Sequence, residues 1–508
     1  MLPPFVMGNP CLVKRLTLGF VLIALVFGCV ASAQGPRLAD AKTDAHFEQI
    51  CRNIQAKLDR SIANTPIPGA TLGFVLADGR HASFASGFRD RETKTRLQPT
   101  DPMYAGSIGK TFVAAVTLQL VSEDKLNLDT KIANWLGQRP WFLKLPNGKD
   151  ITLRMLLNHS SGIPNHVEEK SFFPAAVKGA NRDINYEELL TYVLNKTPLF
   201  PAGRGYYYAD TNYILVGLIV EKATGNSLYD EVSRRLLKPL GLSATYPTNT
   251  NATPVVSGYF QNNPINKNGK YYINPQWEWA GGGFGSNVGD LALWAKNLYG
   301  GDVLSKEIRE LMFSSTAVGD GKNYGLGVEI LHGKYGTSYG HDGEFPGYLS
   351  VMRYYPSYGI AVAAQINIDE TKGIEGFIDT VTDDFAQVII DEISERKIPE
   401  NEKSQLKNIS ESWLSLIDAG KFSESWDGIS AELRAKFSRE KWPAALEPFL
   451  MKVGKFKSRK FKSIVSSEPS VIAVDFDSSF SKLKVATETV FLKLEKDGKW
   501  RVSSYSIN

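Results

Sequence analysis

Apolar residues follow a helical period near the start of the chain and alternate in short runs farther on. Five of them fall on one face of an expected helix: Phe47, Ile50, Cys51, Ile54 and Leu58. Two strand patterns follow, over residues 70–76 and 81–87, on either side of Asp78-Gly79. Because Asp-Gly favours the tight turn of a two-residue hairpin, the pattern predicts an N-terminal helix followed by a β-hairpin.

The middle of the chain, residues 107–242, is mostly helical in pattern and is interrupted by polar loops. Strand patterns return over 348–354 and 360–367, joined by the turn residues 356–359. Strands at both ends and helices between them predict one mixed sheet. Strands from the N- and C-terminal parts of this unit would complete the sheet, and the helical segment between them would lie beside it.

A charged and polar stretch separates this unit from the end of the chain. Residues 396–409 contain Pro399 and few apolar positions, which predicts a linker. We therefore expect a first domain over 34–395 and a smaller domain over 410–508. In the smaller domain the pattern is helical over 413–450 and strand-like from 471, with a turn at Asp497-Gly498.

Residues 1–33 have the pattern of an export signal. Lys14 and Arg15 precede an uncharged run over 16–30, which ends in the small residues that signal peptidase reads, Ala31-Ser32-Ala33. The run is shorter than the ~20 apolar residues of a spanning helix, so removal before Gln34 is expected. Residues 26–29 also resemble a lipoprotein cleavage box. Phe27 is bulky for that motif, so a lipid anchor on Cys29 ranks second.

No later segment approaches the ~18 consecutive apolar residues of a spanning helix. After removal of the signal we expect no membrane-spanning segment and a location in the periplasm or outside the cell.

The amino-acid composition excludes several classes of protein. Hydrophobic residues make up 43% of the chain and charged residues 22%, as in ordinary globular proteins. The 58 Lys and Arg against 54 Asp and Glu leave a formal charge of +4, too small to indicate nucleic-acid binding. Three cysteines are too few for a disulfide framework, and neither zinc-site spacing nor His-Glu-x-x-His occurs. We therefore expect no nucleic-acid partner, no metal and no cofactor.

The first candidate for chemistry is Ser107-Ile108-Gly109-Lys110, which opens an apolar helix that extends to residue 121. Residues three apart share a helix face, so Lys110 can place its amine beside the Ser107 hydroxyl. A serine becomes a nucleophile when a base takes its proton, and N–H groups of a first helical turn can bind an oxyanion. Taken alone, the pattern is more often a capping serine beside a solvated lysine.

The same residues offer a second interpretation, because Gly109-Lys110-Thr111 resembles the end of a phosphate-binding loop. That loop needs glycine at position 104, where Tyr104 stands, and a buried strand before it, which Asp101-Pro102 does not provide. We set the nucleotide-binding interpretation aside.

A second candidate is Tyr208-Ala209-Asp210, in a Gly- and Tyr-rich loop before an expected helix over 213–224. A nearby cation can lower the pKa of a phenol and make it a usable general base. The third candidate is Gly340-His341-Asp342-Gly343, just before the hairpin at 348–367. A strand beside the nucleophile can add an N–H to an oxyanion hole and pair with an extended substrate. Taken alone, the neighbouring Tyr206 and Tyr207 of the second motif are equally well explained as packing aromatics, and the third motif is better explained as a turn.

Together and in this order, the three motifs resemble the serine β-lactamase and penicillin-binding-protein superfamily, in the branch of class C β-lactamases, D-peptidases and related esterases. Two further phrases look like signatures of that family: Ile-Thr-Leu-Arg-Met-Leu-Leu-Asn-His-Ser-Ser-Gly-Ile-Pro at 151–164 and Leu-Leu-Lys-Pro-Leu-Gly-Leu at 236–242. The resemblance covers roughly residues 45–395. It implies an α/β/α sandwich around an antiparallel sheet, with a helical subdomain and the site between them.

The resemblance also implies roles for individual residues. Ser107 would be the acylated nucleophile, and Lys110 would assist its deprotonation. Tyr208 would be the general base and the leaving-group acid. The backbone N–H groups of Ser107 and Glu344 would form the oxyanion hole.

Departures from the family pattern concern charge. His341 and Gly343 would line the cleft, but His341 replaces the lysine of the β-lactamase motif, and Asp342 stands where a hydroxyl residue is common. Asp210 stands where Asn is commoner; it would hold Lys110 protonated and shift the base role toward the tyrosine, so both candidates for the base stay open. Without a permanent cation at 341, and with the charge of Asp342 beside it, a substrate carboxylate would bind poorly.

We therefore expect an exported serine hydrolase that acts through an acyl-enzyme on an ester, an amide or a D-amino-acid peptide, with weak or absent β-lactamase activity. Its partner would be a small-molecule or peptide substrate, for which cell-wall fragments are one source. The alternative is a non-catalytic cell-envelope peptide-binding protein on the same scaffold.

Other features are expected to be structural. His159 would hold a loop, and the glycine-rich residues 281–286 would form a turn with backbone close to the cleft. Trp277 and Trp279 fit the substrate pocket and the core equally well.

The C-terminal part resembles a small uncharacterised domain of bacterial exported proteins, on phrases such as Trp413-Leu414, Asp418-Ala419-Gly420 and Asp497-Gly498-Lys499-Trp500. Helices followed by an antiparallel sheet suggest an α+β cone of the cystatin-like or nuclear-transport-factor-like type. Six basic residues cluster within it: Lys452, Lys455, Lys457, Arg459, Lys460 and Lys462. A solvated strand edge explains them best, and docking onto an anionic envelope polymer is the second interpretation.

Overall fold

The computed structural model describes residues 41–248, 255–260, 263–267, 270–319, 322–369, 377–394, 398, 400–468, 471–495 and 497–507. The expected signal over 1–33, with Cys29, lies outside the described residues, as does Pro399 of the expected linker.

The first domain is organised around a nine-stranded sheet in which every pairing is antiparallel. At its centre β1 (Gly69–Val75) pairs with β16 (Ile360–Ile366) on one side and with β2 (His81–Asp90) on the other. Strands from the two ends of the domain therefore meet in the middle of one sheet, as predicted. The expectation of a mixed sheet is wrong, because the described strands of this sheet pair only in antiparallel fashion. The sheet continues through β15 (Tyr348–Tyr355), β14 (Gly336–Phe345), β13 (Glu329–Gly333), β12 (Lys322–Tyr324) and β11 (Thr316–Gly319), and it ends at β3 (Thr95–Arg96) beyond β2.

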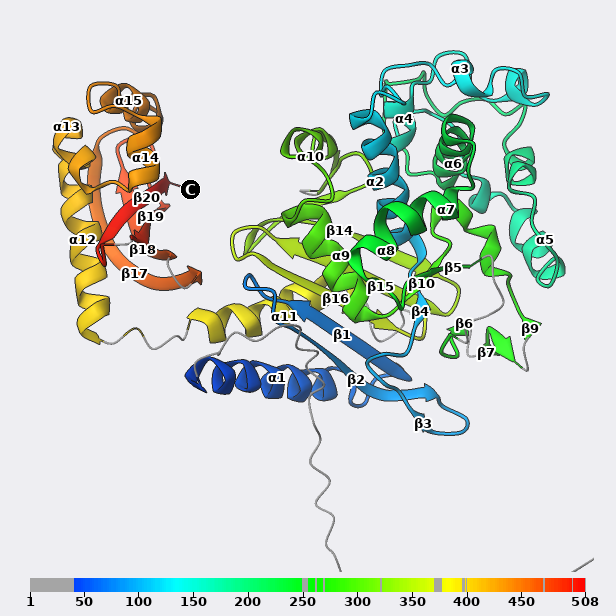
Figure 1. Ribbon diagram of the computed structural model, residues 1–508, viewed down its shortest axis with the longest axis horizontal. Helices are drawn as coiled ribbons and strands as arrows, with labels where there is room; N and C mark the ends of the chain where they lie inside the picture. Colours follow the sequence, from blue (N-terminus) through cyan, green and yellow to red (C-terminus); the bar gives the residue numbers. More distant parts are fainter. Residues whose placement is uncertain are drawn as a thin grey trace, which may run out of the picture. The chain divides into compact units, whose positions relative to one another are not determined.

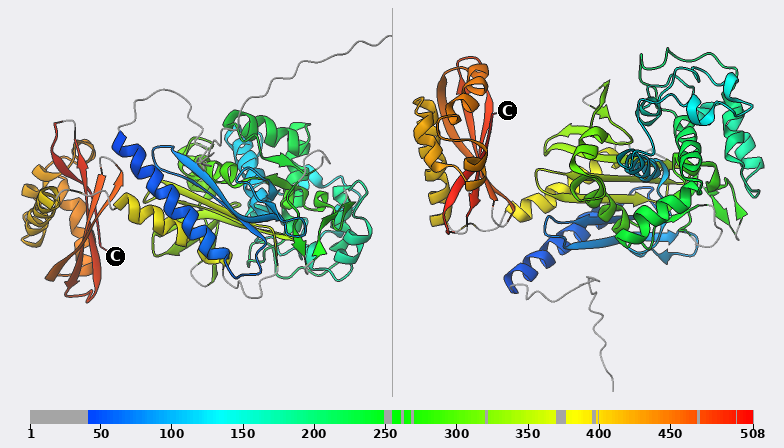
Figure 2. Two further views of the ribbon diagram at one scale, coloured as in Figure 1. Left: turned by 90° about the horizontal axis from the view of Figure 1, so that it is seen from below. Right: turned by 45° about the horizontal axis from the view of Figure 1, so that its top comes forward.

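Helices cover both faces of this sheet (Figures 1 and 2). Helix α9 (Val288–Gly300) lies on one face, and α1 (Ala41–Ile62) packs with α11 (Phe377–Ser394) on the other. The apolar stripe of α1 explains its position, because Ile54 and Leu58 are at most 1% exposed beneath the sheet. Every residue of β1 and β16 is buried, as expected for strands covered on both faces.

The helical subdomain is built on α2 (Gly109–Ser122) and α6 (Asp210–Thr224), which pack against each other. Both are apolar around most of their circumference and are almost wholly buried. Shorter helices surround them: α3 (Ala133–Leu136), α4 (Leu153–Leu157), α5 (Phe172–Lys178), α7 (Leu228–Val232), α8 (Lys238–Leu240) and α10 (Lys306–Met312).

Short strands complete the first domain. A three-stranded sheet contains β4 (Met103–Tyr104), β10 (Phe284–Ser286) and β5 (Tyr246–Pro247). Two small pairs are β6 (Tyr259–Phe260) with β7 (Asn263–Pro264), and β8 (Asn266–Lys267) with β9 (Lys270–Tyr271). Strand β4 leads directly to Ser107, so this small sheet positions the start of α2.

Two helix starts differ from the sequence expectation. Helix α6 begins at Asp210, three residues before the expected start at 213, so Asp210 lies in its first turn. Ser107 lies in a 3₁₀ turn, Gly106–Ile108, that precedes α2.

The C-terminal domain is an α+β unit. Its helices are α12 (Glu400–Asp418), α13 (Phe422–Ser425), α14 (Ala431–Lys436) and α15 (Trp442–Val453), and its strands β17 (Phe456–Glu468), β18 (Val471–Phe480), β19 (Ala486–Leu494) and β20 (Trp500–Ile507) form one antiparallel sheet in that order. Trp413 and Leu414 of α12 belong to the core shared with the sheet. Helix α12 begins inside the expected linker. Strand β17, which carries Lys457, Arg459, Lys460 and Lys462, lies at the edge of the sheet, as expected for this basic cluster.

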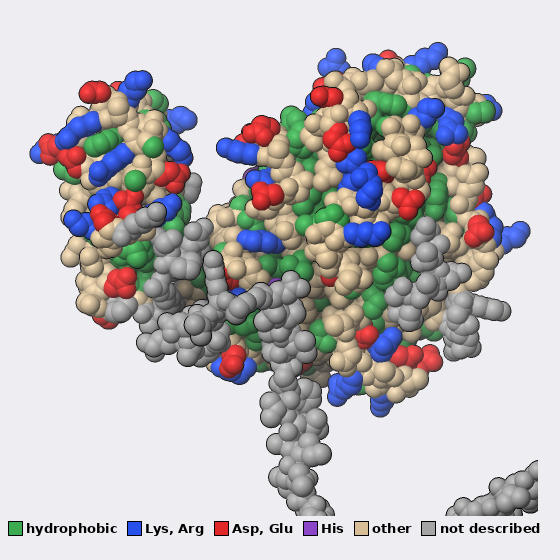
Figure 3. Space-filling model, viewed as in Figure 1, with side chains coloured by type: hydrophobic (Ala, Val, Ile, Leu, Met, Phe, Trp, Pro, Cys, Tyr) green, Lys and Arg blue, Asp and Glu red, His purple; other side chains and the backbone are tan. Residues whose placement is uncertain are grey.

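Within the described part of the chain, no helix combines the length and apolar character needed to cross a bilayer. On the face shown in Figure 3, basic and acidic side chains are interspersed rather than separated into fields of one sign.

Candidate active site

Ser107 and Lys110 meet at the start of α2. The ammonium of Lys110, which is 0% exposed, donates a hydrogen bond to Ser107 Oγ at 2.9 Å. Gly106 has a φ of +52°, and a Cβ there would lie 2.5–2.7 Å from backbone atoms of Glu344. Glycine is therefore required before the serine, because both the left-handed turn and the close strand exclude a side chain.

Lys110 has two further acceptors. Its Nζ lies 2.5 Å from Asp210 Oδ1 and 2.5 Å from the carbonyl oxygen of Gly281. The three N–H bonds of the ammonium are thus directed at a hydroxyl, a carboxylate and a carbonyl. Burial alone would raise the pKa of Asp210, but the charge and the hydrogen bond of Lys110 hold it below its usual value. The resting state is therefore an ion pair.

Tyr208 lies against the same lysine, with Lys110 Nζ 4.9 Å from the ring centroid. Its hydroxyl is buried and forms no hydrogen bond of good geometry with the described residues, although Ser107 is near enough to lower its pKa. Burial, followed by the carboxylate of Asp210, raises the pKa of Tyr208 well above 10. The expectation that the lysine lowers this pKa is wrong for the resting site, because burial disfavours the phenolate and Asp210 offsets the cation.

The loop that carries Tyr208 is held by two buried side chains. The N–H of Ala209 donates to His159 Nδ1 at 3.1 Å, and the N–H of Asp210 donates to Asn165 Oδ1 at 3.0 Å. The expected loop-holding role of His159 is confirmed by the first of these bonds. Both partners come from the loop after α4, so α4 and α6 together fix where Tyr208 lies.

Strand β14 passes close to the serine. A Cβ on Gly343 would lie 2.0 Å from the carbonyl oxygen of Ala105, so only glycine permits this approach. The hydroxyl of Ser350, opposite Gly343 on β15, donates to the same carbonyl at 2.7 Å. The backbones of Ser107 and Glu344 are thereby brought to adjacent positions, while the side chain of Glu344 is exposed.

His341 is placed behind the site rather than on its surface. Its side chain is 1% exposed, and Nε2 lies 2.8 Å from the hydroxyl of Tyr324. Burial, helped by the charge of Lys110, lowers its pKa to about 3, so the imidazole is neutral. The expected position of His341 at the cleft lining is corrected: the ring packs beside Tyr208, with centroids 6.2 Å apart.

Asp342 has a counter-ion that sequence analysis missed. Arg353 on β15 lies across Gly340, and its Nη2 is 2.5 Å from Asp342 Oδ1 and 2.7 Å from Glu329 Oε2. The expected repulsion of a substrate carboxylate by Asp342 is therefore reduced, because Arg353 shares its charge between the two acids. Register across three strands creates this cluster, which no local pattern reveals.

Glu278 is a further titratable group at this site that sequence analysis missed. Burial and the carboxylate of Asp210 raise its pKa to about 8, against the opposing charge of Lys110. A Cβ on Gly282 would lie 2.5 Å from Glu278 Oε2, so this glycine leaves room for the carboxyl group. The glycine-rich segment does approach the cleft, since Gly281 accepts from Lys110. Trp277 and Trp279, by contrast, are 4% and 1% exposed and belong to the core.

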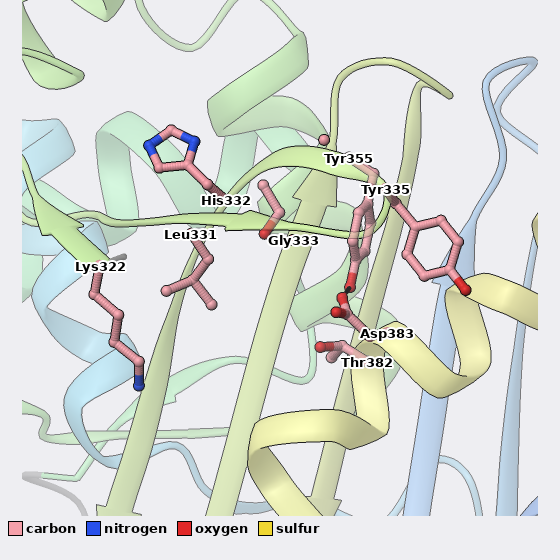
Figure 4. A pocket seen from close by; sticks show the side chains of 10 residues that line it. Lys322, Leu331, His332, Gly333, Tyr335, Tyr355, Thr382 and Asp383 are labelled. Atoms are coloured by element: carbon pink, nitrogen blue, oxygen red, sulfur yellow. Dashed lines mark hydrogen bonds between the residues drawn. The ribbon is translucent and has the colours of Figure 1, made fainter. Parts of the chain in front are cut away.

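A separate cavity of about 200 Å³ lies between the β12–β15 edge of the sheet and α11 (Figure 4). Its walls include Lys322, His332, Tyr335 and Asp383, and none of the residues of the serine site. The Tyr355 hydroxyl donates to Asp383 Oδ1 at 2.6 Å, so that carboxylate is already partnered. Among the described residues, no group of three or more His, Cys, Asp and Glu side chains is placed to hold a metal ion.

The fold and the convergence of a serine, a lysine and a tyrosine define a serine hydrolase of the β-lactamase and penicillin-binding-protein class. The chain belongs to the Beta-lactamase family, whose model matches residues 52–383. Residues 409–505 match a second family, described as a protein of unknown function (DUF4019).

Individual relatives agree with this assignment. Penicillin-binding protein 4* of Bacillus subtilis is 25% identical over 290 residues, which cover 54% of this chain and 61% of that protein. The structure of a D-stereospecific amidohydrolase from Streptomyces sp. is 28% identical, with a TM-score of 0.55, and covers 63% of this chain and 96% of that one. D-amino acid amidase from Ochrobactrum anthropi SV3, at 22% identity and a TM-score of 0.57, covers 68% and 99% and shares the fold.

Proposed function

We propose that this protein is an exported hydrolase that forms an acyl-enzyme on Ser107 from amides or esters of D-amino acids. The observation that carries the proposal is the buried lysine at the start of α2, which joins the hydroxyl of Ser107 to the carboxylate of Asp210 beside Tyr208. A binding protein has no need of a nucleophile, a proton relay and a phenol in one place.

The hydrogen bonds of Lys110 favour this residue as the base that takes the proton of Ser107. The ammonium donates to three acceptors and has no lone pair for the Ser107 proton. Transfer of one proton across the 2.5 Å contact to Asp210 leaves a neutral amine that faces Ser107. This neutral pair lies above the ion pair in free energy, because the pKa of Asp210 is lowered. It is reached as attack begins.

Tyr208 then acts as the acid. Its raised pKa keeps the phenol protonated, so it has a proton to give to the leaving nitrogen. During attack the neutral Lys110 amine accepts the Ser107 proton. As the C–N bond breaks, Tyr208 protonates the leaving amine and regains a proton from the Lys110 ammonium, and Asp210 then returns its proton to Lys110. The net result is transfer of the Ser107 proton to the leaving group. Attack of water on the ester reverses these transfers.

The oxyanion would be bound by the backbone N–H groups of Ser107 and Glu344. Their segments are in contact because Gly106 and Gly343 lack side chains. One such donor contributes about 3 kcal/mol to stabilisation of the tetrahedral intermediate.

Charge around the site supports the substrate class. His341 is neutral and Arg353 is shared between two acids, so neither offers a free cation to a substrate carboxylate. Glu278 is neutral at pH 7 because its pKa is raised to about 8, and the charge of Asp210 is paired with Lys110. Substrates with a blocked carboxyl group fit this environment. The named activities of the Streptomyces and Ochrobactrum proteins support the preference for D-amino-acid amides.

Labelling with a fluorophosphonate followed by mass spectrometry tests the nucleophile. We expect one adduct on Ser107 and none in Ser107→Ala. A panel of D- and L-amino-acid amides, esters and a chromogenic cephalosporin then tests the substrate class. Absence of any adduct in the folded protein would favour the envelope peptide-binding alternative, and efficient cephalosporin turnover would contradict the charge argument.

A further inference from the structure

One end of the C-terminal domain is formed by two lysine-rich segments, residues 451–457 at the junction of α15 and β17 and residues 481–485 between β18 and β19. We call this end the lysine tip. The N–H of Ser481 donates to the carbonyl of Lys455 at 2.7 Å, and the N–H of Lys482 donates to that of Val453 at 3.0 Å. The N–H of Lys455 donates in return to Ser481 Oγ at 2.9 Å. The two segments therefore form one fixed surface.

The base of the lysine tip is rigid. Val453, Phe480 and Ala486 form a small apolar core beneath it. Gly454 has a φ of +84°, and a Cβ there would lie 2.2 Å from Ser481 Oγ. The close approach of the segments thus depends on a glycine at the joint.

The outer surface of the lysine tip combines cations with apolar side chains. It presents Lys452, Lys455, Lys457, Lys482 and Lys484. Neither segment contains an acidic residue. Between these cations stand Met451, 71% exposed, and Val485, 86% exposed. Met451 and Val485 are neighbours in sequence of Lys452 and Lys484.

The lysine tip lies at the end of the domain opposite the point where the chain arrives. The chain enters the domain at Glu400, and α12 carries it over 19 residues, about 28 Å at 1.5 Å per residue. At the far end of this helix Asp418 accepts a hydrogen bond from Arg459 of β17 at 2.7 Å. Arg459 follows the lysine tip by two residues, so the tip lies near the end of α12 rather than near its start at Glu400.

We propose that the lysine tip docks this domain onto the surface of a bilayer that contains anionic phospholipid. Lysine ammonium groups are attracted to the negative surface potential of such a bilayer, and apolar side chains between them enter the boundary between headgroups and acyl chains. A soluble anionic polymer would satisfy the lysines but would leave Met451 and Val485 in water. The apolar pair therefore decides between the two partners.

Sedimentation with vesicles tests the proposal. The protein beginning at Gln34 is mixed with phosphatidylcholine vesicles that contain or lack phosphatidylglycerol. We expect binding only to the anionic vesicles and a decrease with added salt. The tip variant, with Lys452→Gln, Lys455→Gln, Lys457→Gln and Lys484→Gln, is expected to bind at least about tenfold more weakly. A second variant, Met451→Ser with Val485→Ser, is expected to bind several-fold more weakly at unchanged charge.

A matched control removes four lysines elsewhere on the same domain: Lys421→Gln, Lys436→Gln, Lys441→Gln and Lys499→Gln. It loses the same net charge and is expected to bind as the parent protein does. Equal weakening by the tip variant and this control would overturn the proposal, since net charge alone would then explain binding. Binding to soluble polyphosphate with undiminished vesicle binding by the serine variant would assign the lysine tip to a polymer instead. Thermal unfolding at an unchanged temperature verifies that each variant is folded.

Discussion

Each domain buries an ion pair, Lys110–Asp210 in the first and Arg459–Glu488 in the second, and the two pairs have different surroundings. Glu488 is 0% exposed and accepts two hydrogen bonds from Arg459, at 2.5 and 2.9 Å, and one each from Ser478 and Tyr505. Every oxygen of this carboxylate is satisfied. Such a network fixes the position of β17 and leaves no group free to react.

The pair in the first domain is incomplete by comparison. Lys110 is fully engaged, but the buried Tyr208 hydroxyl beside it lacks a bond of good geometry with the described residues, and the half-buried Glu278 has a raised pKa. A buried polar group without a partner is costly, and perturbed pKa values cluster at functional sites, so these groups around one serine point to chemistry. The two ion pairs carry the same charges. They differ in whether the polar groups around them have hydrogen-bond partners.

The largest expected effect is on activity, from Lys110→Met. Without the amine, acylation of Ser107 is expected to slow at least about 10³-fold, because neither the base nor the partner of Asp210 remains. The variant should also be less stable, since Asp210 becomes an unpaired buried charge. Acylation rate and thermal unfolding measure the two effects separately.

A double variant, Lys110→Met with Asp210→Asn, separates the effect on acylation from the effect on stability. We expect the unfolding temperature to recover while the acylation rate does not. Recovery of activity would mean that the lysine is only structural.

For the pair Arg459–Glu488 we expect a loss of stability without a loss of hydrolytic activity. Arg459→Met leaves Glu488 buried without its cation, which is expected to cost the C-terminal domain about 3–5 kcal/mol of unfolding free energy. Hydrolysis by the first domain should be unchanged. Chemical denaturation with domain-specific probes measures this loss. Arg459→Lys keeps the charge but loses the bidentate hydrogen bonds, and it is expected to lose less unfolding free energy. A lower hydrolytic rate in folded Arg459→Met would contradict the claim that this second ion pair serves stability alone.

Tyr208→Phe sharpens the assignment of the acid. We expect kcat for amides to fall about 10²-fold, because the leaving nitrogen must be protonated. Esters with a phenolate leaving group should be affected less, since that group departs without a proton. Equal losses for both substrates would return the tyrosine to the role of general base.

A final expected effect is a dependence of stability on pH, governed by Glu278. Its folded-state pKa of about 8 lies above its ordinary value of 4.5. Between these values the folded protein holds a proton that the unfolded chain has released, so the unfolding free energy falls as pH rises through this window. Glu278→Gln removes this dependence. Its unfolding temperature, relative to the parent, should rise between pH 5 and pH 8.5, and parallel curves would contradict the assigned pKa.

Local patterns predicted much of the scaffold. The hairpin at Asp78-Gly79, the helix that buries Ile54 and the hairpin that joins β15 to β16 are confirmed, because each depends on residues close in sequence. Spacing also placed Lys110 beside Ser107, since three residues on a helix determine that distance. The family resemblance, rather than spacing, brought Tyr208 to the same site.

What sequence analysis missed depends on contacts between distant segments. The partnership of Asp342 with Arg353 requires the register of β14 against β15, and the position of Glu278 requires the packing of a loop on α2. The pKa of Tyr208 was expected to move in the wrong direction because burial cannot be read from a list of neighbouring charges. The start of α12 at Glu400 likewise overrides a polar composition that suggested a linker.

The alternation of side chains along β14 sets a rule for altering selectivity. Position 343 is closed to any side chain by the carbonyl of Ala105, whereas the next position, 344, points into solvent from a backbone that is held in place. Libraries that vary residue 344 and hold its neighbour at glycine would therefore explore new leaving groups or acyl chains without disturbing the geometry of attack.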